Sequence, residues 1–421
     1  MLKNLAVICQ LILICSCGRG SNIATARSLP VIKDTVSFDV IGDKDFGVVV
    51  IKDTIDLKNR LCIIPSGITL SFKGGIIKNG ALVGNMTKLK SSQPCFDCVR
   101  ILGTWNVPIV KSTYFRDLSY DNALKDVVAM ANPRVKNTVI IDEGVYHVTA
   151  MENSDACIPL CSNTDVILYG KIILTPNAYT NYYIIKIQGD NINLRGNATL
   201  EGDKHTHLGK VGEWGMGINI DHSNNVTVSG LTIKDCWGDC IYVGGKSGDV
   251  SIEKCSLDHG RRQGISITSA KRVTIKDCSI SNVAGTLPEY AIDIEPNKGN
   301  NIDKVVIDNV TVSNCKGGFC AYGTAKESRI GRIVIKGCYV SSQEKMTIAM
   351  EECEDVLIEK NTLIRKNDHR VMACEHIGKI IIKNNKLQSR KKDVTKSRLG
   401  RITTFYSKLS LIENNEELLL E

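Results

Sequence analysis

The chain has 421 residues and a net charge of +8, with 53 Lys and Arg against 45 Asp and Glu. Aromatic residues are only 5% of the chain and are not interleaved with basic ones, which argues against a nucleic-acid partner. The charge fits either an ordinary solvated surface or attraction to an acidic polymer. The length suits one long solenoid as well as two or three domains.

A targeting segment is predicted at the N-terminus. Lys3 precedes an apolar run at 5–14, which is too short for a comfortable membrane span. The letters ICSCG follow at 14–18 and resemble the lipobox of bacterial lipoproteins. The resemblance implies a signal peptide over 1–17, a lipid on Cys17 that anchors the protein in the membrane, and a tether over 18–35. An ordinary signal peptide cut nearby is the alternative. Both predict export, and the lipobox predicts an outer-membrane or cell-surface lipoprotein.

Residues 36–110 are predicted to form a β-rich leading segment. Alternating residues at 63–72 turn at Pro65-Ser66-Gly67, and a similar Gly-rich run covers 74–84. These strands fit either irregular first turns of a solenoid or a small appended sheet.

A short helix is predicted from Asp121 to Met130, with Asp121 as its N-cap. A strand at 138–141 and the letters GVYHV at 144–148 follow it. This order resembles the N-terminal cap of the pectin-lyase-like superfamily, in which a helix closes the apolar end of a β-helix. The resemblance implies a β-helix with a cap helix over 111–408 and a C-terminal tail or cap over 409–421.

A coil-length repeat runs through the C-terminal half and predicts an all-β, right-handed parallel β-helix. Its steps are mostly 23 or 24 residues, and its apolar anchors are Val226, Val250, Val273, Val305, Ile333, Val356 and Ile380. Five residues after each anchor stand Leu231, Cys255, Cys278, Val310, Cys338, Asn361 and Asn385. We expect the cysteines of this second column to be buried, stacked thiols rather than disulfides.

Two other cysteine pairs are better candidates for a disulfide or a metal, namely Cys95 with Cys98 and Cys157 with Cys161. No second CxxC pair supports a zinc site, and we predict no metal at these cysteines.

Residues 190–300 resemble family 28 glycoside hydrolases, the polygalacturonase-like enzymes. The letters GNATLEGD at 196–203, WGDCIYVG at 237–244 and RQGISI at 262–267 match three of that family's rungs. The resemblance implies an inverting hydrolysis with Asp239 as general acid. The two other family aspartates would stand at Gly238 and near Met216, and the family histidine is Gln263 here, so only Asp239 is carried over.

The residues around Asp239 predict a site of their own. Arg261 and Arg262, one turn later, are candidates for binding a carboxylate through bidentate hydrogen bonds. Asp293 and Glu295, two apart on a further strand, would project from one surface as a base or as calcium ligands. This set suits a hydrolase, or a lyase or epimerase that removes a C5 proton. A ladder of ion pairs that holds the rungs in register is the structural alternative.

Further substrate contacts are predicted from an inserted loop and the neighbouring rungs. The candidates are His205, His207, Trp214, Trp237, Tyr242 and Gln263. The loop could supply a general acid or base, a Ca²⁺ contact or a stacking surface for a sugar, or be an ordinary polar loop. We predict no cofactor, and the sequence leaves open whether Ca²⁺ is needed.

The sequence therefore predicts an exported carbohydrate-active enzyme that cleaves or remodels an extended acidic polysaccharide. A non-catalytic glycan-binding or structural β-helix lipoprotein is the alternative, and a phage-tail-like module is a third reading. The sequence specifies neither the sugar nor the oligomeric state.

Overall fold

The computed structural model describes residues 31–41, 47–151, 156–367, 370–389, 402–405 and 409–419. The chain divides into two compact units, Met1–Val107 with Ser112–Met130, and Pro108–Lys111 with Ala131–Glu421. The predicted signal peptide, Cys17 and most of the tether lie outside the described residues. Among the residues described, no helix is both long and apolar enough to cross a membrane.

The first unit is built on parallel strands in the order β1-β3-β5-β4-β2, with β6 paired to β5. Its core includes the Phe96 ring, 5.4–6.3 Å from the rings of Phe72, Trp105 and Phe115. The elements of this unit are β1 (Thr35–Val36), η1 (Phe38–Val40), β2 (Val48–Ile51), β3 (Thr54–Ile63), β4 (Thr69–Phe72), β5 (Ile76–Lys90), β6 (Phe96–Trp105), η2 (Ser112–Tyr114) and α2 (Ala123–Val128).

The helix α2 differs from the predicted one in its bounds and its neighbours. It begins at Ala123, and its N-cap is Asn122 with φ 60°, not Asp121. It contacts β6 of the same unit, where buried Asp126 accepts hydrogen bonds from the Ile101 N–H (2.9 Å) and the Tyr120 hydroxyl (3.2 Å). The helix is thus grouped with the leading segment, whereas we predicted it as part of the β-helix.

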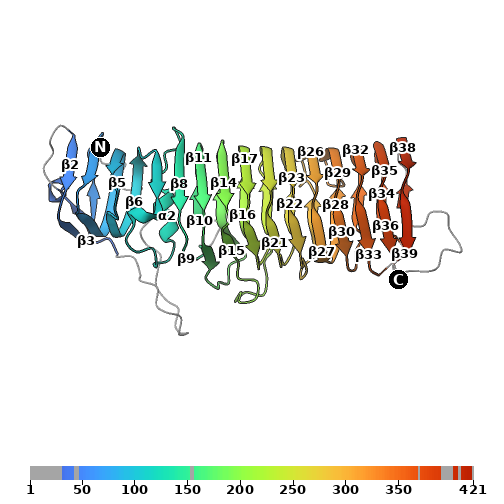
Figure 1. The fold of residues 1–421 in the computed structure, drawn as a ribbon, viewed down its shortest axis with the longest axis horizontal. Helices are drawn as coiled ribbons and strands as arrows, with labels where there is room; N and C mark the ends of the chain where they lie inside the picture. The colour runs from blue at the N-terminus through green and yellow to red at the C-terminus, as the bar shows by residue number, and fades with distance from the viewer. Residues whose placement is uncertain are drawn as a thin grey trace. The chain divides into compact units, whose positions relative to one another are not determined.

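The second unit consists of three parallel sheets, and from β10 onward every turn of the chain adds one strand to each (Figure 1). Sheet 1 contains β10 (Ala156–Leu160), β13 (Asn181–Ile187), β16 (Trp214–Asp221), β19 (Ile241–Gly244), β22 (Ile265–Ile267), β25 (Tyr290–Ile294), β28 (Gly317–Tyr322), β31 (Ile348–Glu351), β34 (Met372–Glu375) and β37 (Ile402–Phe405).

Sheet 2 contains β7 (Ile109–Lys111), β8 (Asn137–Ile141), β11 (Thr164–Leu168), β14 (Ile192–Gly196), β17 (Asn224–Ser229), β20 (Gly248–Glu253), β23 (Ala270–Lys276), β26 (Asn301–Asp308), β29 (Arg329–Lys336), β32 (Cys353–Glu359), β35 (Lys379–Lys383) and β38 (Leu409–Glu413).

Sheet 3 contains β9 (Val145–Val148), β12 (Lys171–Leu174), β15 (Thr199–Glu201), β18 (Thr232–Lys234), β21 (Ser256–Asp258), β24 (Ser279–Ser281), β27 (Thr311–Cys315), β30 (Tyr339–Ser342), β33 (Thr362–Arg365), β36 (Lys386–Ser389) and β39 (Glu416–Leu419). Strands β38 and β39 form the last turn, so the β-helix continues past residue 408, where we placed its end.

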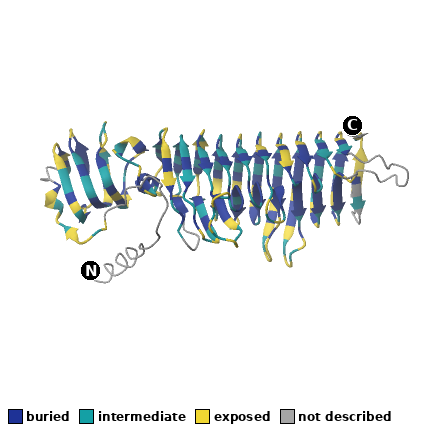
Figure 2. Cartoon of the chain, turned by 90° about the horizontal axis from the view of Figure 1, so that it is seen from below, coloured by how far each residue is buried: buried dark blue, intermediate teal, exposed yellow. Residues whose placement is uncertain are grey.

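The predicted anchors stack in sheet 2 in the predicted register. The seven anchors form six successive pairs, from Val226 with Val250 to Val356 with Ile380, and all seven are at most 2% exposed. In β23, the inward Val273 and Ile275 are buried and the outward Lys276 is exposed. Figure 2 shows buried residues on the strands throughout the second unit. Burial of β-branched side chains on every turn therefore determines the register.

The second column of the repeat is buried, and its polar members form a ladder. The Asn361 side chain accepts from the Cys338 N–H (2.8 Å) and donates to the Ile335 carbonyl (3.1 Å) and to Asn385 Oδ1 (2.9 Å). Asn385 repeats the pattern with Asn415 on the next turn (2.9 Å). An amide suits this bend because it satisfies buried backbone groups that would otherwise lack partners.

The cysteines of the second column are buried free thiols, as predicted. Cys95 and Cys161 are also free thiols, so neither Cys95–Cys98 nor Cys157–Cys161 is bridged.

The inner ladder generates a stability prediction. Asn361→Ala leaves the Cys338 N–H and the Ile335 carbonyl buried without their partner, so the free energy of unfolding should fall by ~2–4 kcal/mol. Ser279→Ala, which removes an exposed hydroxyl contact with Ser256, is the control and should stay within ~0.5 kcal/mol. Thermal unfolding followed by circular dichroism measures both. Equal melting temperatures for the two variants would contradict a structural role for the ladder.

Candidate functional site

An outward-facing column of side chains on sheet 1 joins Tyr242, Ser266 and Asp293 on three successive turns. Tyr242 pairs with Ser266, and Ser266 pairs with Asp293 on the next turn. Their side chains face outward because the isoleucines on either side of Ser266 and Asp293 fill the core. The Tyr242 hydroxyl lies 2.6 Å from the hydroxyl of Thr268, which follows β22 on the next turn.

Asp239 lies just before β19 and is completely buried. Its Oδ2 accepts a hydrogen bond from the Ser266 hydroxyl at 2.8 Å, and the Arg262 Nη1 lies 3.4 Å away. Burial raises the pKa of Asp239 to about 6, although the Arg262 guanidinium and the Ser266 hydroxyl both lower it. The group can therefore hold a proton close to neutral pH.

Asp293 is a second buried carboxyl group, 2% exposed. Its Oδ2 accepts from Gln263 Nε2 at 2.8 Å, and its Oδ1 accepts from the Cys320 thiol at 3.1 Å. Burial raises its pKa to about 7. Glu295 on the same side of the chain is exposed, so the two predicted carboxylates differ in environment.

Gln263 does not contact solvent, which differs from its predicted role as a substrate contact. Its Oε1 accepts from the Tyr290 N–H at 2.8 Å while its Nε2 donates to Asp293. Both ends of the amide are therefore used to link one turn to the next. Cys320, which completes the hydrogen bonding of Asp293, was missed in the sequence, although it follows Asp293 in the same outer column.

Arg262 lies between the buried carboxyl groups and the surface, with 19% of its side chain exposed. Its contacts are long: 3.4 Å from Nη1 to Asp239, 3.5 Å from Nη1 to Ser266, and 3.4 Å from Nε to Glu213. Burial lowers its pKa, but Asp239, Asp293 and Glu213 raise it, and the net direction is upward. The site therefore contains a charged guanidinium whose donors are poorly used.

Arg261 faces elsewhere, so the two arginines do not form the predicted joint clamp. Its Cζ lies 3.8 Å from the centre of the Trp237 ring. Its Nη1 donates to the Gly212 carbonyl (2.9 Å) and the Trp237 carbonyl (3.1 Å). Arg261 thus holds the end of the inserted loop rather than a ligand.

His207, in the inserted loop between β15 and β16, and Trp237, between β18 and β19, also differ from their predicted roles as substrate contacts. The His207 side chain is fully buried, with Nδ1 2.8 Å from Asp203 Oδ2. Its ring stacks between Tyr182 (5.9 Å) and Trp237 (4.0 Å). Trp237 therefore has His207 on one face and Arg261 on the other, and neither aromatic residue offers a free face to a sugar.

The other two loop candidates are accessible. Trp214 is 50% exposed at the start of β16. The His205 side chain is 64% exposed, and its Nε2 lies 3.1 Å from Asp235 Oδ1. Within the described residues, no group of three or more His, Cys, Asp or Glu is arranged to hold a metal ion.

Several residues of the candidate site and of the adjoining loop have buried polar atoms without a hydrogen-bond partner. Among the described residues they include Asn219 Oδ1, Trp237 Nε1, Arg262 Nε and His207 Nε2. Asn219 precedes Tyr242 in the outer column of sheet 1. Such atoms cost free energy unless water or a ligand satisfies them, and Arg262, with its long contacts to Asp239 and Glu213, is therefore the candidate residue for binding a ligand.

A family model matches part of the second unit and describes its fold. Residues 151–331 match the family model described as "Right handed beta helix region". Together with the parallel register, this match identifies the second unit as a right-handed parallel β-helix, as predicted.

Two proteins of Bacillus subtilis (strain 168) are similar in sequence. The SPbeta prophage-derived uncharacterized protein YorA is 25% identical over 245 residues, which cover 52% of this chain and 41% of YorA. The uncharacterized protein YclG is 29% identical over 208 residues, which cover 42% of this chain and 35% of YclG. The chain thus spans less than half the length of either relative.

Solved structures with a similar fold include the A-module of the Azotobacter vinelandii mannuronan C-5 epimerase AlgE6, at a TM-score of 0.49 and 12% identity over 70% of this chain and 91% of that one. The tailspike gp49 of Acinetobacter baumannii bacteriophage Fri1, a capsular polysaccharide depolymerase, has a TM-score of 0.47 and 14% identity. The match covers 73% of this chain and 58% of the tailspike chain. An exopolygalacturonase from Thermotoga maritima also has a TM-score of 0.47 and 14% identity. The match covers 73% of this chain and 91% of the exopolygalacturonase chain. Likenesses this distant assign neither a substrate nor a site residue.

The raised pKa of Asp293 predicts a pH dependence of stability. The native state holds this proton more tightly than an unfolded chain, where the pKa is near 3.8. The stabilising contribution is therefore present below about pH 4 and is lost as the pH rises toward about 7. An asparagine does not titrate, so Asp293→Asn should not lose stability through this group as the pH rises. The free energy of unfolding of the variant relative to the wild type should therefore increase between about pH 4 and pH 8, by a few kcal/mol in order of magnitude.

Thermal unfolding across that pH range measures the gain. Glu327→Gln, at an exposed carboxylate, is the control and should show no such trend. A difference between Asp293→Asn and the wild type that stays constant with pH would contradict the assigned protonation.

Proposed function

We propose that the protein is an exported enzyme that cleaves or remodels an extended acidic polysaccharide, with Asp239 as its general acid. The main support is Arg262, whose contacts are all 3.4 Å or longer and which lies next to buried carboxyl groups with pKa values raised to about 6 and about 7. A guanidinium with unused donors favours an anionic ligand, and an acid with a near-neutral pKa suits proton transfer.

The chemistry follows from these groups. Arg262 binds a sugar carboxylate, which takes the place of the exposed Glu213 carboxylate on the guanidinium. Movement of Arg262 outward then uncovers Asp239, which gives its proton to the departing glycosidic oxygen. In a hydrolase, water adds to the anomeric carbon and loses a proton to Asp293 or Glu295. In a lyase, the same base takes the C5 proton and an unsaturated sugar remains.

Non-catalytic glycan binding is the second candidate function, and the burial of Asp239 favours it. The carboxyl group is 0% exposed and contacts Ser266 and Arg262 already. A binder would retain acidic glycans on an array without forming product. The phage-tail-like module stays a third prediction, and a trimer in solution would favour it.

Activity assays separate these candidates. A panel of plant, algal and host polysaccharides is incubated with the protein, with and without a chelator, and both reducing ends and unsaturated products are measured. Asp239→Asn should lower turnover at least ~100-fold while the protein stays folded. Arg262→Ala should raise KM at least ~10-fold for acidic substrates.

Arg332→Gln is the control, because Arg332 is a surface arginine of sheet 2 paired with Asp355. Unchanged turnover in Asp239→Asn would exclude Asp239 as the acid. Retention of the glycan without product in the wild type would support the binding function instead.

Membrane attachment is part of the proposal and is supported by the letters ICSCG at 14–18. When the full chain is expressed in bacteria, it should sediment with membranes and incorporate labelled palmitate. Cys17→Ala should do neither. A variant that sediments with membranes as the wild type does would contradict lipidation at Cys17.

A further inference from the structure

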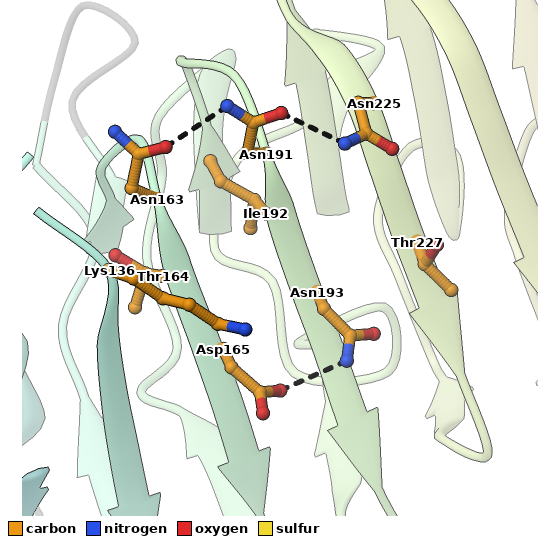
Figure 3. Close-up of a pocket in the computed structure, with 9 residues that line it drawn as sticks. All are labelled: Lys136, Asn163, Thr164, Asp165, Asn191, Ile192, Asn193, Asn225 and Thr227. Atoms are coloured by element: carbon orange, nitrogen blue, oxygen red, sulfur yellow. Dashed lines mark hydrogen bonds between the residues drawn. The ribbon is translucent and has the colours of Figure 1, made fainter.

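A second polar surface lies on sheet 2, away from Asp239. A hollow of about 420 Å³ is formed over β11, β14 and β17 (Figure 3). Two outward columns of polar side chains line it: a rim of Asn163, Asn191 and Asn225, and a floor of Asp165, Asn193 and Thr227. The columns follow the rungs, which repeat every ~4.8 Å.

The rim is a ladder of amides with unused hydrogen-bonding capacity. Asn191 Nδ2 donates to Asn163 Oδ1 at 3.0 Å, and Asn225 Nδ2 donates to Asn191 Oδ1 at 2.9 Å. An asparagine side chain has two N–H donors and two acceptor lone pairs. Within the described residues, Asn191 therefore keeps one donor and one acceptor for a ligand.

The floor is close to electrically neutral. Asp165 accepts two hydrogen bonds from Arg195, at 3.1 and 3.0 Å, which balance its charge. Asn193 Nδ2 donates to Asp165 Oδ1 at 3.0 Å. Lys136 is the one cationic residue among those that line the hollow. The described residues provide no ion pair for it. The hollow thus presents mainly amide and hydroxyl groups.

The same columns change character on the following turns. A smaller hollow of about 290 Å³ lies over β20, β23 and β26, where the rim column holds the Asp249–Arg272 ion pair and then Lys304. The neutral surface is therefore confined to the earlier rungs.

Backbone conformation explains why asparagine occupies some positions of this hollow but not others. The left-handed φ values of Asn163, Asn191 and Asn225 (61°, 59° and 56°) explain why asparagine stands at the rim. They do not explain Asn193, which lies within a strand, where asparagine is disfavoured. The rim ladder is also solvent-exposed, so its hydrogen bonds add little stability, unlike those of buried Asn361.

We propose that this hollow binds an uncharged, hydroxyl-rich glycan strand that crosses successive rungs. Its hydroxyl groups accept from and donate to Asn191 and Asn193, because each amide offers both functions at the spacing of the turns. The site is non-catalytic, since its only lining carboxylate is neutralised by Arg195. It does not rest on the proposed function of the Asp239 site, which belongs to a different sheet.

The chain offers a closely matched pair of variants for the test. Asn191→Gly removes the amide without strain, because glycine adopts φ near 59° readily. Asn314→Gly does the same at φ 53° in another exposed amide ladder, where Asn314 bonds to Asn282 and Gln343 outside the hollow. Both variants change one exposed amide at a left-handed bend.

The probes are neutral tetrasaccharides of glucose, mannose and galactose, with a tetrasaccharide of galacturonic acid as the charged counterpart. Saturation-transfer NMR and calorimetry on the full chain should detect binding of at least one neutral probe. Asn191→Gly should weaken this binding about tenfold, and Asn314→Gly should leave it unchanged. Asp239→Asn should also leave it unchanged, which separates this site from the proposed acid.

Three results would overturn the proposal. The first is the absence of neutral-glycan binding at millimolar concentrations. The second is equal binding by the two glycine variants. The third is binding of only the acidic probe, with loss of that binding in Lys136→Met, which would make the hollow a simple anion site.

Discussion

The parallel register between successive turns is the constraint on which every part of the second unit depends. Inward Val and Ile side chains stack turn upon turn, and a shift of one residue would expose all of them. The outward side chains are therefore also aligned, although they are 23 or more residues apart in sequence. Both the Asp239 site and the amide hollow are consequences of this alignment.

The outer face of sheet 1 shows how the same alignment produces different environments. Asp293 and Glu295 stand two residues apart and face the same side, yet only Asp293 is buried. The difference comes from neighbours on adjacent turns, since Gln263 and Cys320 enclose Asp293 from either side. Burial then raises its pKa, and Arg262 lies where it contacts Asp239 beneath it and Glu213 near the surface. The proposed enzyme has its main support in this arginine.

In and around the inserted loop, some candidate residues are packed within the protein and others are accessible to a ligand. His207, Trp237 and Arg261 form one stack, and Asp203 holds its end through His207 and Tyr182. Their polar and aromatic groups are used within the protein. Trp214, His205 and Glu213 remain accessible at the edge of the same loop. A ligand at this face would therefore meet these three residues and Arg262 first.

The sequence by itself determined the β-helix, the register of its anchors and the buried second column that contains Cys255, Cys278 and Asn361. Those features depend on a regular period, and a period can be read from one chain. Only the tertiary structure decided that Arg261 turns to Trp237 while Arg262 turns to Asp239, and that Gln263 and His207 are buried. The direction in which a side chain points at a bend depends on its contacts with other turns and with an inserted loop of irregular length. No local sequence pattern encodes those contacts.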